Sequence, residues 1–141
     1  MSDPYNLARF VEAQGPVYVR AFQELQAGRK TSHWMWFVFP QLRGLGHSEM
    51  AQRYGLSGLE EGRAYLAHAV LGNRLGRCVS VLLQHAGKSA RQILGTPDDL
   101  KLRSCLTLFG QVDPANPLWQ LALEQFFDGE PDKATLGLLR R

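Results

Sequence analysis

The chain has 141 residues, of which 45% are hydrophobic and 21% charged, and its net charge is +3. This length suits one domain, residues 1–141, that buries a core without disulfides or metals. The small charge, spread along the chain, argues against a dedicated nucleic-acid binder, and no apolar run approaches the ~18 residues of a membrane-spanning helix, so we expect no membrane partner.

The first part of the chain predicts a series of short helices. Asp3 is a suitable N-cap for a first helix, which ends at Gly15. Apolar residues spaced three and four apart then predict a second helix over residues 16–27. We also expect a short helix over residues 33–38, because Pro40 disfavours helical geometry before it and no strand-like run exists that could pair with a strand here.

The second part of the chain continues the helical pattern. Ser57-x-x-Glu60 matches a capping box and predicts a helix start. An apolar face predicts a long helix over residues 69–84. Further helices are expected over residues 48–54, 89–95, 96–110 and 116–126, with a last short helix at the end of the chain. The sequence therefore predicts an all-α fold, a single compact multi-helix domain of about six to eight helices.

The densest aromatic stretch is SHWMWFVFPQ, residues 32–41. A helix with large apolar side chains around most of its circumference is buried centrally, which is one interpretation of this stretch. The other is that one tryptophan and His33 line a cleft. A flat ring beside a histidine suits a nucleobase or another planar ligand, and a buried indole N–H needs a partner.

A loop with two glycines, LRGLGHS, follows the aromatic stretch and precedes a helix that Ser48 would cap. Backbone N–H groups at a helix start attract anions, and glycine lets a phosphate approach. The loop lacks the preceding strand of a Rossmann turn and the Gly-Lys-Ser/Thr of a P-loop, so an ordinary capped loop is the alternative. Basic and polar side chains gather around both stretches: Arg29, Lys30, His33, Gln41, Arg43, His47 and Arg53.

These observations define a predicted site for a small anionic ligand, with Arg53 and Lys101 as anion partners. If the protein is an enzyme, His33 and His47 are the candidate catalytic residues, because they are the near-neutral proton carriers there, and hydrolysis or group transfer is the expected reaction class. Lys101 and Ser104 share a helix face and could form an activated nucleophile, although such pairs are usually solvated. The predicted ligand-binding residues are His33, Trp34, Trp36, Gln41, Arg43, Gly44, Gly46, His47, Ser48, Arg53 and Lys101.

Other residues indicate packing. Gly72 and Gly76 stand four apart within a predicted helix, where close helix packing is the favoured interpretation and a ligand-facing role the alternative.

Cys78 and Cys105 lie among apolar residues without a Cys-x-x-Cys pair, and the histidines show no ligand spacing, so we expect no metal and no cofactor. Free buried thiols and the absence of a secretory signal at the first residues predict a cytoplasmic protein.

Three segments carry a resemblance to a known family: SHWMWFVFPQLRGLGHSEMAQRYGL, EEGRAYLAHAVLGNRLGRC and ILGTPDDLKLRSCLTLF. The chain resembles, over about residues 6–135, a bacterial domain family of unknown function whose members are sometimes labelled calpastatin. The resemblance implies a small, mostly helical, cytoplasmic protein and carries over no catalytic residue. The family usually has proline after the histidine of its Tyr-Leu-x-His stretch, where this chain has Ala69. Calpastatin inhibitory regions are disordered, which this globular composition is not.

Two functions from different classes remain after the sequence analysis. The first is binding or processing of a small anionic, planar, nucleotide-like ligand in a cleft lined by Trp, His and Gln. The second is a non-catalytic protein-interaction module with an exposed aromatic surface. A solvent-accessible indole of Trp34 or Trp36 in a hollow beside polar groups favours the ligand, a flat exposed patch favours a partner, and complete burial favours neither. The sequence leaves the oligomeric state open.

Overall fold

A computed structural model describes residues 2–140, and within them ten helices form and no strand does. None of these helices is both long and apolar enough to cross a membrane. The helices are α1 (Ala8–Gln14), α2 (Tyr18–Ala27), α3 (Met35–Val38), α4 (Glu49–Tyr54), α5 (Leu59–Ala67), α6 (Leu71–Leu83), α7 (Ala90–Leu94), α8 (Asp98–Val112), α9 (Leu118–Phe127) and α10 (Lys133–Leu139).

The protein is therefore all-α, but the expected number of six to eight helices is wrong. The segments expected to be helical already number ten when they are counted one by one, and the short ones among them form separate helices. α3 has four residues and ends just before Pro40, which cannot continue a helical ladder. α7 has five residues, begins at a capping box formed by Ser89 and Gln92, and ends at Gly95. Each short helix keeps its own start and stop signals, so it does not merge with its neighbours.

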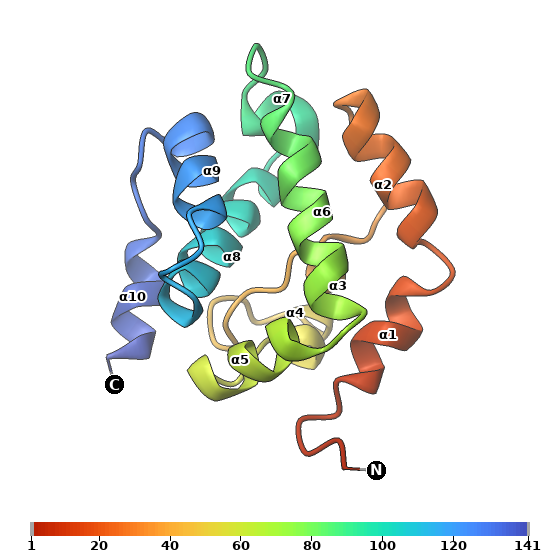
Figure 1. Cartoon of the computed structure of the whole chain (residues 1–141), viewed down its shortest axis with the longest axis vertical. Coiled ribbons are helices and arrows are strands. Elements are labelled where there is room, and N and C mark those ends of the chain that lie inside the picture. The colour runs from red at the N-terminus through yellow and green to blue at the C-terminus, as the bar shows by residue number, and fades with distance from the viewer. Residues whose placement is uncertain (1, 141) are drawn as a thin grey trace.

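The long helices α6 and α8 organise the core. α6 packs against α2, α5 and α9, and α8 packs against α5, α7, α9 and α10. In Figure 1, α6 runs down the middle of the molecule, with α2 on one side and α8 and α9 on the other. Burial of one face of each helix supplies most of its stability, since isolated helices this short are marginal in water.

The aromatic stretch lies largely in the core, as its composition indicated. Trp34, Met35, Phe37, Val38 and Phe39 are all buried, and Trp36 is partly exposed. Ring contacts connect the stretch to its surroundings, with 5.2 Å between the centroids of Phe37 and Tyr54. α3 in turn packs against α1 and α4, so the position of Trp36 is fixed by the core around it.

The predicted capping box of Ser57 and Glu60 does not form. The backbone N–H and the hydroxyl of Ser57 instead donate to Oε1 of Glu61, at 2.8 and 2.9 Å. Gly58 is the N-cap residue of α5, and Glu60 lies on the exposed side of the helix, where it pairs with Arg63. The buried carboxylate of Glu61 takes both Ser57 donors because it needs partners and Glu60 is solvated.

Candidate ligand-binding site

A buried carboxylate, Glu24 of α2, anchors the segment before α3. Its Oε1 accepts hydrogen bonds from the backbone N–H groups of Thr31 and Ser32 and from the indole of Trp34, at 2.9, 3.1 and 3.0 Å. Its Oε2 accepts from the Ser32 hydroxyl at 2.6 Å. Burial by itself raises the pKa of Glu24, but the hydrogen bonds from Ser32, Thr31 and Trp34 outweigh it and lower the pKa to about 2.

This anchor explains two residues of the aromatic stretch. Trp34 is 1% exposed, and its indole N–H donates to Glu24. Ser32 binds the same carboxylate through both its backbone and its hydroxyl. Both residues hold the segment on α2. His33, between them, has an exposed side chain.

Trp36 lines a small hollow together with Gln41 and Lys101, and the other lining residues are Phe39, Met50, Ala51, Tyr54 and Gly55. We call this feature the Trp36 hollow. Its volume is about 10 Å³, which is room for about one water molecule. The ammonium group of Lys101 lies 4.8 Å from the centroid of the Trp36 ring, within the range of a cation–π contact. Three predicted site residues therefore meet at one place.

Two residues that the sequence analysis did not include in the site complete its charged side. Asp98, the first residue of α8, accepts through Oδ2 from the ammonium of Lys30 at 2.9 Å and through Oδ1 from that of Lys101 at 3.2 Å. The Lys30 ammonium also lies 5.0 Å from the centroid of the Trp34 ring. Each lysine thus contacts one tryptophan and one oxygen of the same carboxylate.

The partners of Lys101 and Ser104 show that these two residues do not form a nucleophilic pair. Lys101 binds Asp98. The Ser104 hydroxyl is buried and donates to the carbonyl of Leu100 at 3.1 Å and to the carboxylate of Asp132 at 3.2 Å. Ser104 therefore belongs to the contact between α8 and α10.

The glycine loop has structural reasons for its residues. Gly44 has φ +105°, a conformation that strongly favours glycine. A Cβ added at Gly46 would lie 2.8 Å from the Cβ of Ala51, so glycine permits a close approach to α4. Ser48 caps α4 by accepting from the backbone N–H of Ala51 at 3.1 Å. The side chain of His47 is exposed.

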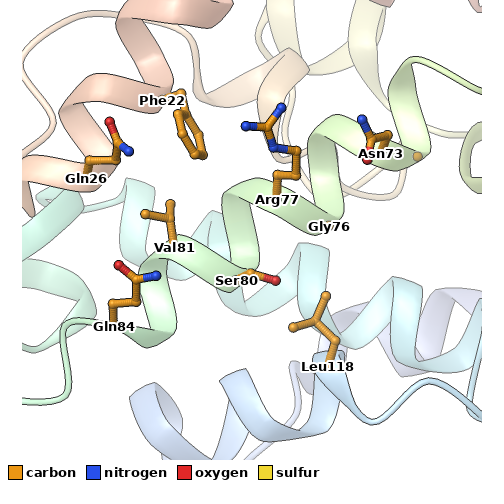
Figure 2. Close-up of a pocket in the computed structure, with 10 residues that line it drawn as sticks. Phe22, Gln26, Asn73, Gly76, Arg77, Ser80, Val81, Gln84 and Leu118 are labelled. Carbon is orange, nitrogen blue, oxygen red and sulfur yellow. The ribbon is translucent and has the colours of Figure 1, made fainter.

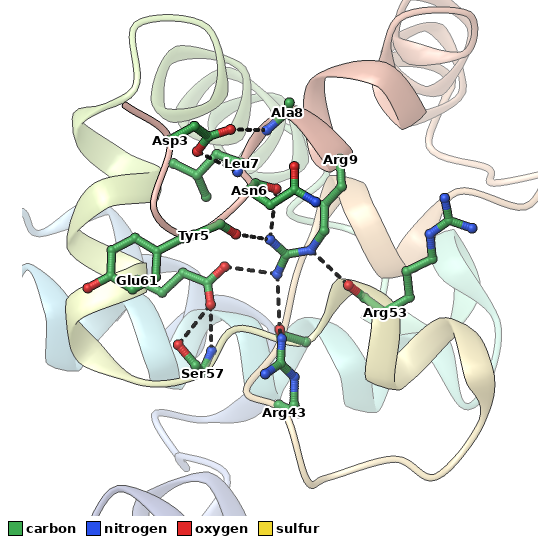
Figure 3. Close-up of polar contacts among 11 residues, drawn as sticks. Asp3, Tyr5, Asn6, Leu7, Ala8, Arg9, Arg43, Arg53, Ser57 and Glu61 are labelled. Atoms are coloured by element: carbon green, nitrogen blue, oxygen red, sulfur yellow. Dashed lines mark hydrogen bonds and ion pairs between the residues drawn. The ribbon is translucent and has the colours of Figure 1, made fainter. Parts of the chain in front are cut away.

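Arg43 and Arg53 do not line the Trp36 hollow; they lie beside Arg9 (Figure 3). The three arginines line a surface hollow of about 450 Å³ with Tyr5, Asn6, Glu12 and Gln52. Arg43 donates to the carbonyl of Gly55 at 3.0 Å, and the Arg53 guanidinium lies 5.5 Å from the centroid of the Tyr54 ring. The structure therefore divides the predicted basic cluster between two places.

The side chain of Arg9 connects several segments of the chain. Its guanidinium donates to the carbonyls of Tyr5, Asn6, Arg53 and Gly55 and pairs with Glu61 Oε2 at 2.8 Å (Figure 3). The sequence analysis did not single out Arg9, because backbone carbonyl partners outside a residue's own helix leave no signal in the sequence.

A larger groove of about 470 Å³ runs along α6 between α2 and the start of α9 (Figure 2). The Arg77 guanidinium lies over the Phe22 ring on one side of it, 5.2 Å from the centroid. The two glycines of α6 differ here. A Cβ at Gly72 would lie 2.1 Å from the carbonyl oxygen of Leu66, whereas a Cβ at Gly76 would meet open space. Both glycines line the groove. Close packing explains Gly72, whereas no neighbour lies where a Cβ of Gly76 would be.

Neither metal ligation nor thiol chemistry finds support in the described residues. Within residues 2–140 no three His, Cys, Asp or Glu side chains gather as a metal site requires. Cys78 and Cys105 are free and buried. Burial raises the pKa of the Cys78 thiol to about 12 and raises that of Cys105 well above its usual value.

Together these features define a small all-α protein whose partly exposed tryptophan lies beside a lysine-bearing hollow. The chain belongs to the family described as "Protein of unknown function (DUF1810)", which matches residues 4–139. It is also similar to the conserved hypothetical protein Rv1873 from Mycobacterium tuberculosis, known from a crystal structure. The two are 52% identical, each is covered over 99% of its length, and the TM-score is 0.97. A comparison with curated proteins finds no match. The resemblance to a family of unknown function is thereby confirmed.

Proposed function

We propose that the protein binds a small anionic, planar ligand of the nucleotide type at the Trp36 hollow. The observation that carries the proposal is the meeting of Trp36, Gln41 and Lys101, from two distant parts of the chain, around one hollow. A tryptophan ring offers a stacking surface for a planar group. The Gln41 amide offers a donor and an acceptor, and Lys101 offers a positive charge.

The hollow must open to admit a planar ring, because its present volume of about 10 Å³ holds only one water molecule. Met50 is the lining residue best able to move. It is only partly buried, and its unbranched side chain has three rotatable bonds. It also belongs to α4, a helix of six residues. We therefore propose that rotation of the Met50 side chain opens the face of Trp36.

Binding is the better-supported role for this site, and a reaction is not proposed. Neither His33 nor His47, the candidate proton carriers, is among the residues that line the Trp36 hollow. Trp34 contributes indirectly, since its ring is buried and its N–H is bound by Glu24. Arg43 and Arg53 line a different surface, so we leave them out of the proposed ligand site.

The alternative of a protein-interaction module finds less support. The large apolar side chains that are exposed within residues 2–140 are Val19, Val70, Leu100 and Leu121. They come from different parts of the chain, from α2 to α9. Single exposed apolar residues are normal on monomeric proteins and do not mark an interface.

A ligand screen read by thermal unfolding and tryptophan fluorescence tests the proposal. The probes are adenosine, guanosine, cytidine and uridine, with their 5′-monophosphates. Trp36 dominates any change in accessibility, because Trp34 and Trp119 are 1% and 2% exposed. A ligand at 100 times its dissociation constant adds about 2.7 kcal/mol to the free energy of unfolding.

Four variants test the contacts that the proposal assigns to the ligand. Trp36→Ala and Gln41→Ala should abolish or weaken the stabilisation by the ligand, and Trp36→Phe should retain part of it because a ring remains. Met50→Ala should strengthen binding by opening the hollow. Leu121→Ala, at an exposed position of α9, is the matched control. If no probe stabilises the protein, or if Trp36→Ala responds as the parent chain does, the proposal fails and the interaction module becomes the better hypothesis.

A further inference from the structure

The charged groups beside the Trp36 hollow carry a second inference, which rests on the proposed function. Lys30 and Lys101 each bind one oxygen of Asp98. The exposed fractions of the three side chains differ: 7% for Lys30, 22% for Lys101 and 19% for Asp98. Lys101 is therefore the ammonium that a ligand reaches first, and Lys30 lies behind the carboxylate in a nearly buried position.

The charges of this trio do not cancel. Two ammonium groups and one carboxylate leave a net charge of +1 on Lys30, Asp98 and Lys101. With Lys101 and Asp98 alone, the pair would be neutral and would hold an anion weakly. Because Lys30 shares Asp98, the positive charge of Lys101 is only partly compensated.

The charged groups that are linked to the trio through Trp34 form an ion pair of their own. Glu24 binds the indole of Trp34, whose ring lies beneath the Lys30 ammonium, and the Arg20 guanidinium pairs with Glu24 at 3.5 Å. Glu24 and Arg20 together contribute no net charge. Asp99 follows Asp98 on α8, where successive residues point about 100° apart around the helix axis.

Lys101 also has unused hydrogen-bonding capacity. An ammonium group has three donors, and among the described residues Lys101 donates one of them, to Asp98 Oδ1. Lysine binds phosphate as a point charge, without the bidentate geometry of the arginine fork, which fits both carboxylate and phosphate. The Lys101 ammonium lies 4.8 Å from the centroid of the Trp36 ring, so its remaining donors and the stacking surface are adjacent.

We infer that the anionic group of the ligand is a phosphate bound by Lys101, and that Lys30 is a positioning residue. Lys30 acts through Asp98. It holds the carboxylate that orients Lys101, and its positive charge compensates the negative charge of Asp98. Lys30 itself does not touch the ligand.

The test compares each nucleoside with its own 5′-monophosphate by calorimetric titration. The variants are Lys101→Gln, Lys30→Gln, Lys30→Arg and Asp98→Asn, and Lys133→Gln, at an exposed position of α10, is the matched control. The charge of the trio is +1 in the parent chain, 0 in either glutamine variant and +2 in Asp98→Asn, counted from the same three residues. Thermal unfolding establishes that each variant is folded.

We expect the parent chain to bind a monophosphate about tenfold more tightly than its nucleoside, as a charge-assisted contact provides. Lys101→Gln should remove this preference. Lys30→Gln should reduce the preference for the monophosphate several-fold, and the affinity for the monophosphate should fall more than the affinity for the nucleoside. Lys30→Arg should restore this preference. Asp98→Asn should make the binding of the monophosphate depend more strongly on salt, because the trio then carries a charge of +2.

The outcomes separate the two proposals. Equal affinity of the parent chain for nucleoside and monophosphate would overturn the phosphate inference while the proposed function stands. Equal loss of both affinities in Lys30→Gln would show a merely structural lysine and would overturn its positioning role. If no nucleoside or monophosphate binds at all, the proposed function fails and this inference fails with it.

Discussion

At the scale of single residues, the composition of the aromatic stretch predicted only part of its structure. Its density of large apolar side chains predicted burial, and most of the stretch is buried. Composition could not indicate which tryptophan stays accessible. That depends on Glu24, ten residues earlier on α2, which binds the indole of Trp34 at 3.0 Å and leaves Trp36 beside the hollow. A carboxylate on one helix and an indole in the next loop share no periodicity that a sequence pattern could reveal.

The hydrogen bonds to Glu24 lead to a prediction about stability and pH. The pKa of Glu24 is about 2 in the folded protein, against an ordinary value of 4.5 for a glutamate. When the pH falls below 4.5, the unfolded chain takes up the proton first, so the stability that Glu24 contributes is complete above that pH and is lost as the pH falls toward 2. The contribution at neutral pH is about 3 kcal/mol.

Glu24→Gln should therefore lower the free energy of unfolding at pH 7 and flatten its decrease between about pH 4.5 and 2. Urea unfolding at several pH values measures both effects. Glu124→Gln, at an exposed position of α9, is the control and should leave the profile unchanged. A parent-like slope for Glu24→Gln across this range would contradict the role given to the carboxylate.

At the scale of elements, apolar periodicity predicted the positions of the helices, although their total number was underestimated. The expected long helix at residues 69–84 corresponds to α6 at Leu71–Leu83, and its apolar face is buried. The capping-box prediction failed because a second local partner competes: Ser57 binds Glu61, one residue further along α5, and not Glu60. Small residues at regular spacing were equally ambiguous, because the same pattern serves close packing at Gly72 and open space at Gly76.

That difference between two glycines of one helix gives a matched pair of substitutions. Gly72→Ala should be strongly destabilising, because the new Cβ would lie 2.1 Å from the carbonyl oxygen of Leu66 and the backbone of α5 and α6 must separate. Gly76→Ala should stabilise the protein by about 0.5–1 kcal/mol, because alanine favours a helix interior and its Cβ meets no neighbour. Thermal and urea unfolding measure both, and equal effects of the two substitutions would show that the packing at Leu66 does not decide them.

At the scale of the whole molecule, the candidate site could be predicted only in part. Trp36 and Gln41 stand close in sequence, and Lys101 was included as a distant anion partner. The contribution of Asp98 could not be predicted, because it depends on the packing of the segment around Lys30 against α7, where the backbone N–H of Lys30 donates to the carbonyl of Ile93 at 2.7 Å. Residues 30 and 98 meet through this tertiary contact, which no local pattern records.

The rate at which the two cysteine thiols are labelled measures how readily the core opens. Burial raises the pKa of Cys78 to about 12 and raises that of Cys105, so at neutral pH both are protonated and shielded. Only the thiolate reacts with disulfide reagents. We expect no labelling of the native protein on a timescale of minutes and labelling of two thiols in denaturant. Rapid labelling of the native protein would show that the core opens far more easily than its packing indicates.

The Arg9–Glu61 ion pair leads to a last prediction about how the first part of the chain is held on the rest. The side chains are 10% and 2% exposed, and Arg9 also binds carbonyls of the N-terminal segment and of the end of α4. Removing one partner leaves a buried charge without compensation, which typically costs about 3–5 kcal/mol, whereas replacing both by apolar residues costs much less.

Arg9→Met and Glu61→Met should therefore each be strongly destabilising in urea unfolding, and the double variant should lose clearly less than the sum of the two. The coupling between nearby groups in such a cycle is commonly about 0.5–3 kcal/mol. Arg63→Met, which removes an exposed ion pair with Glu60, is the control and should change stability by less than about 1 kcal/mol. Strict additivity of Arg9→Met and Glu61→Met would mean that Arg9 acts through the backbone carbonyls it binds and not through Glu61. The N-terminal segment would then be held on α4 without the carboxylate of α5.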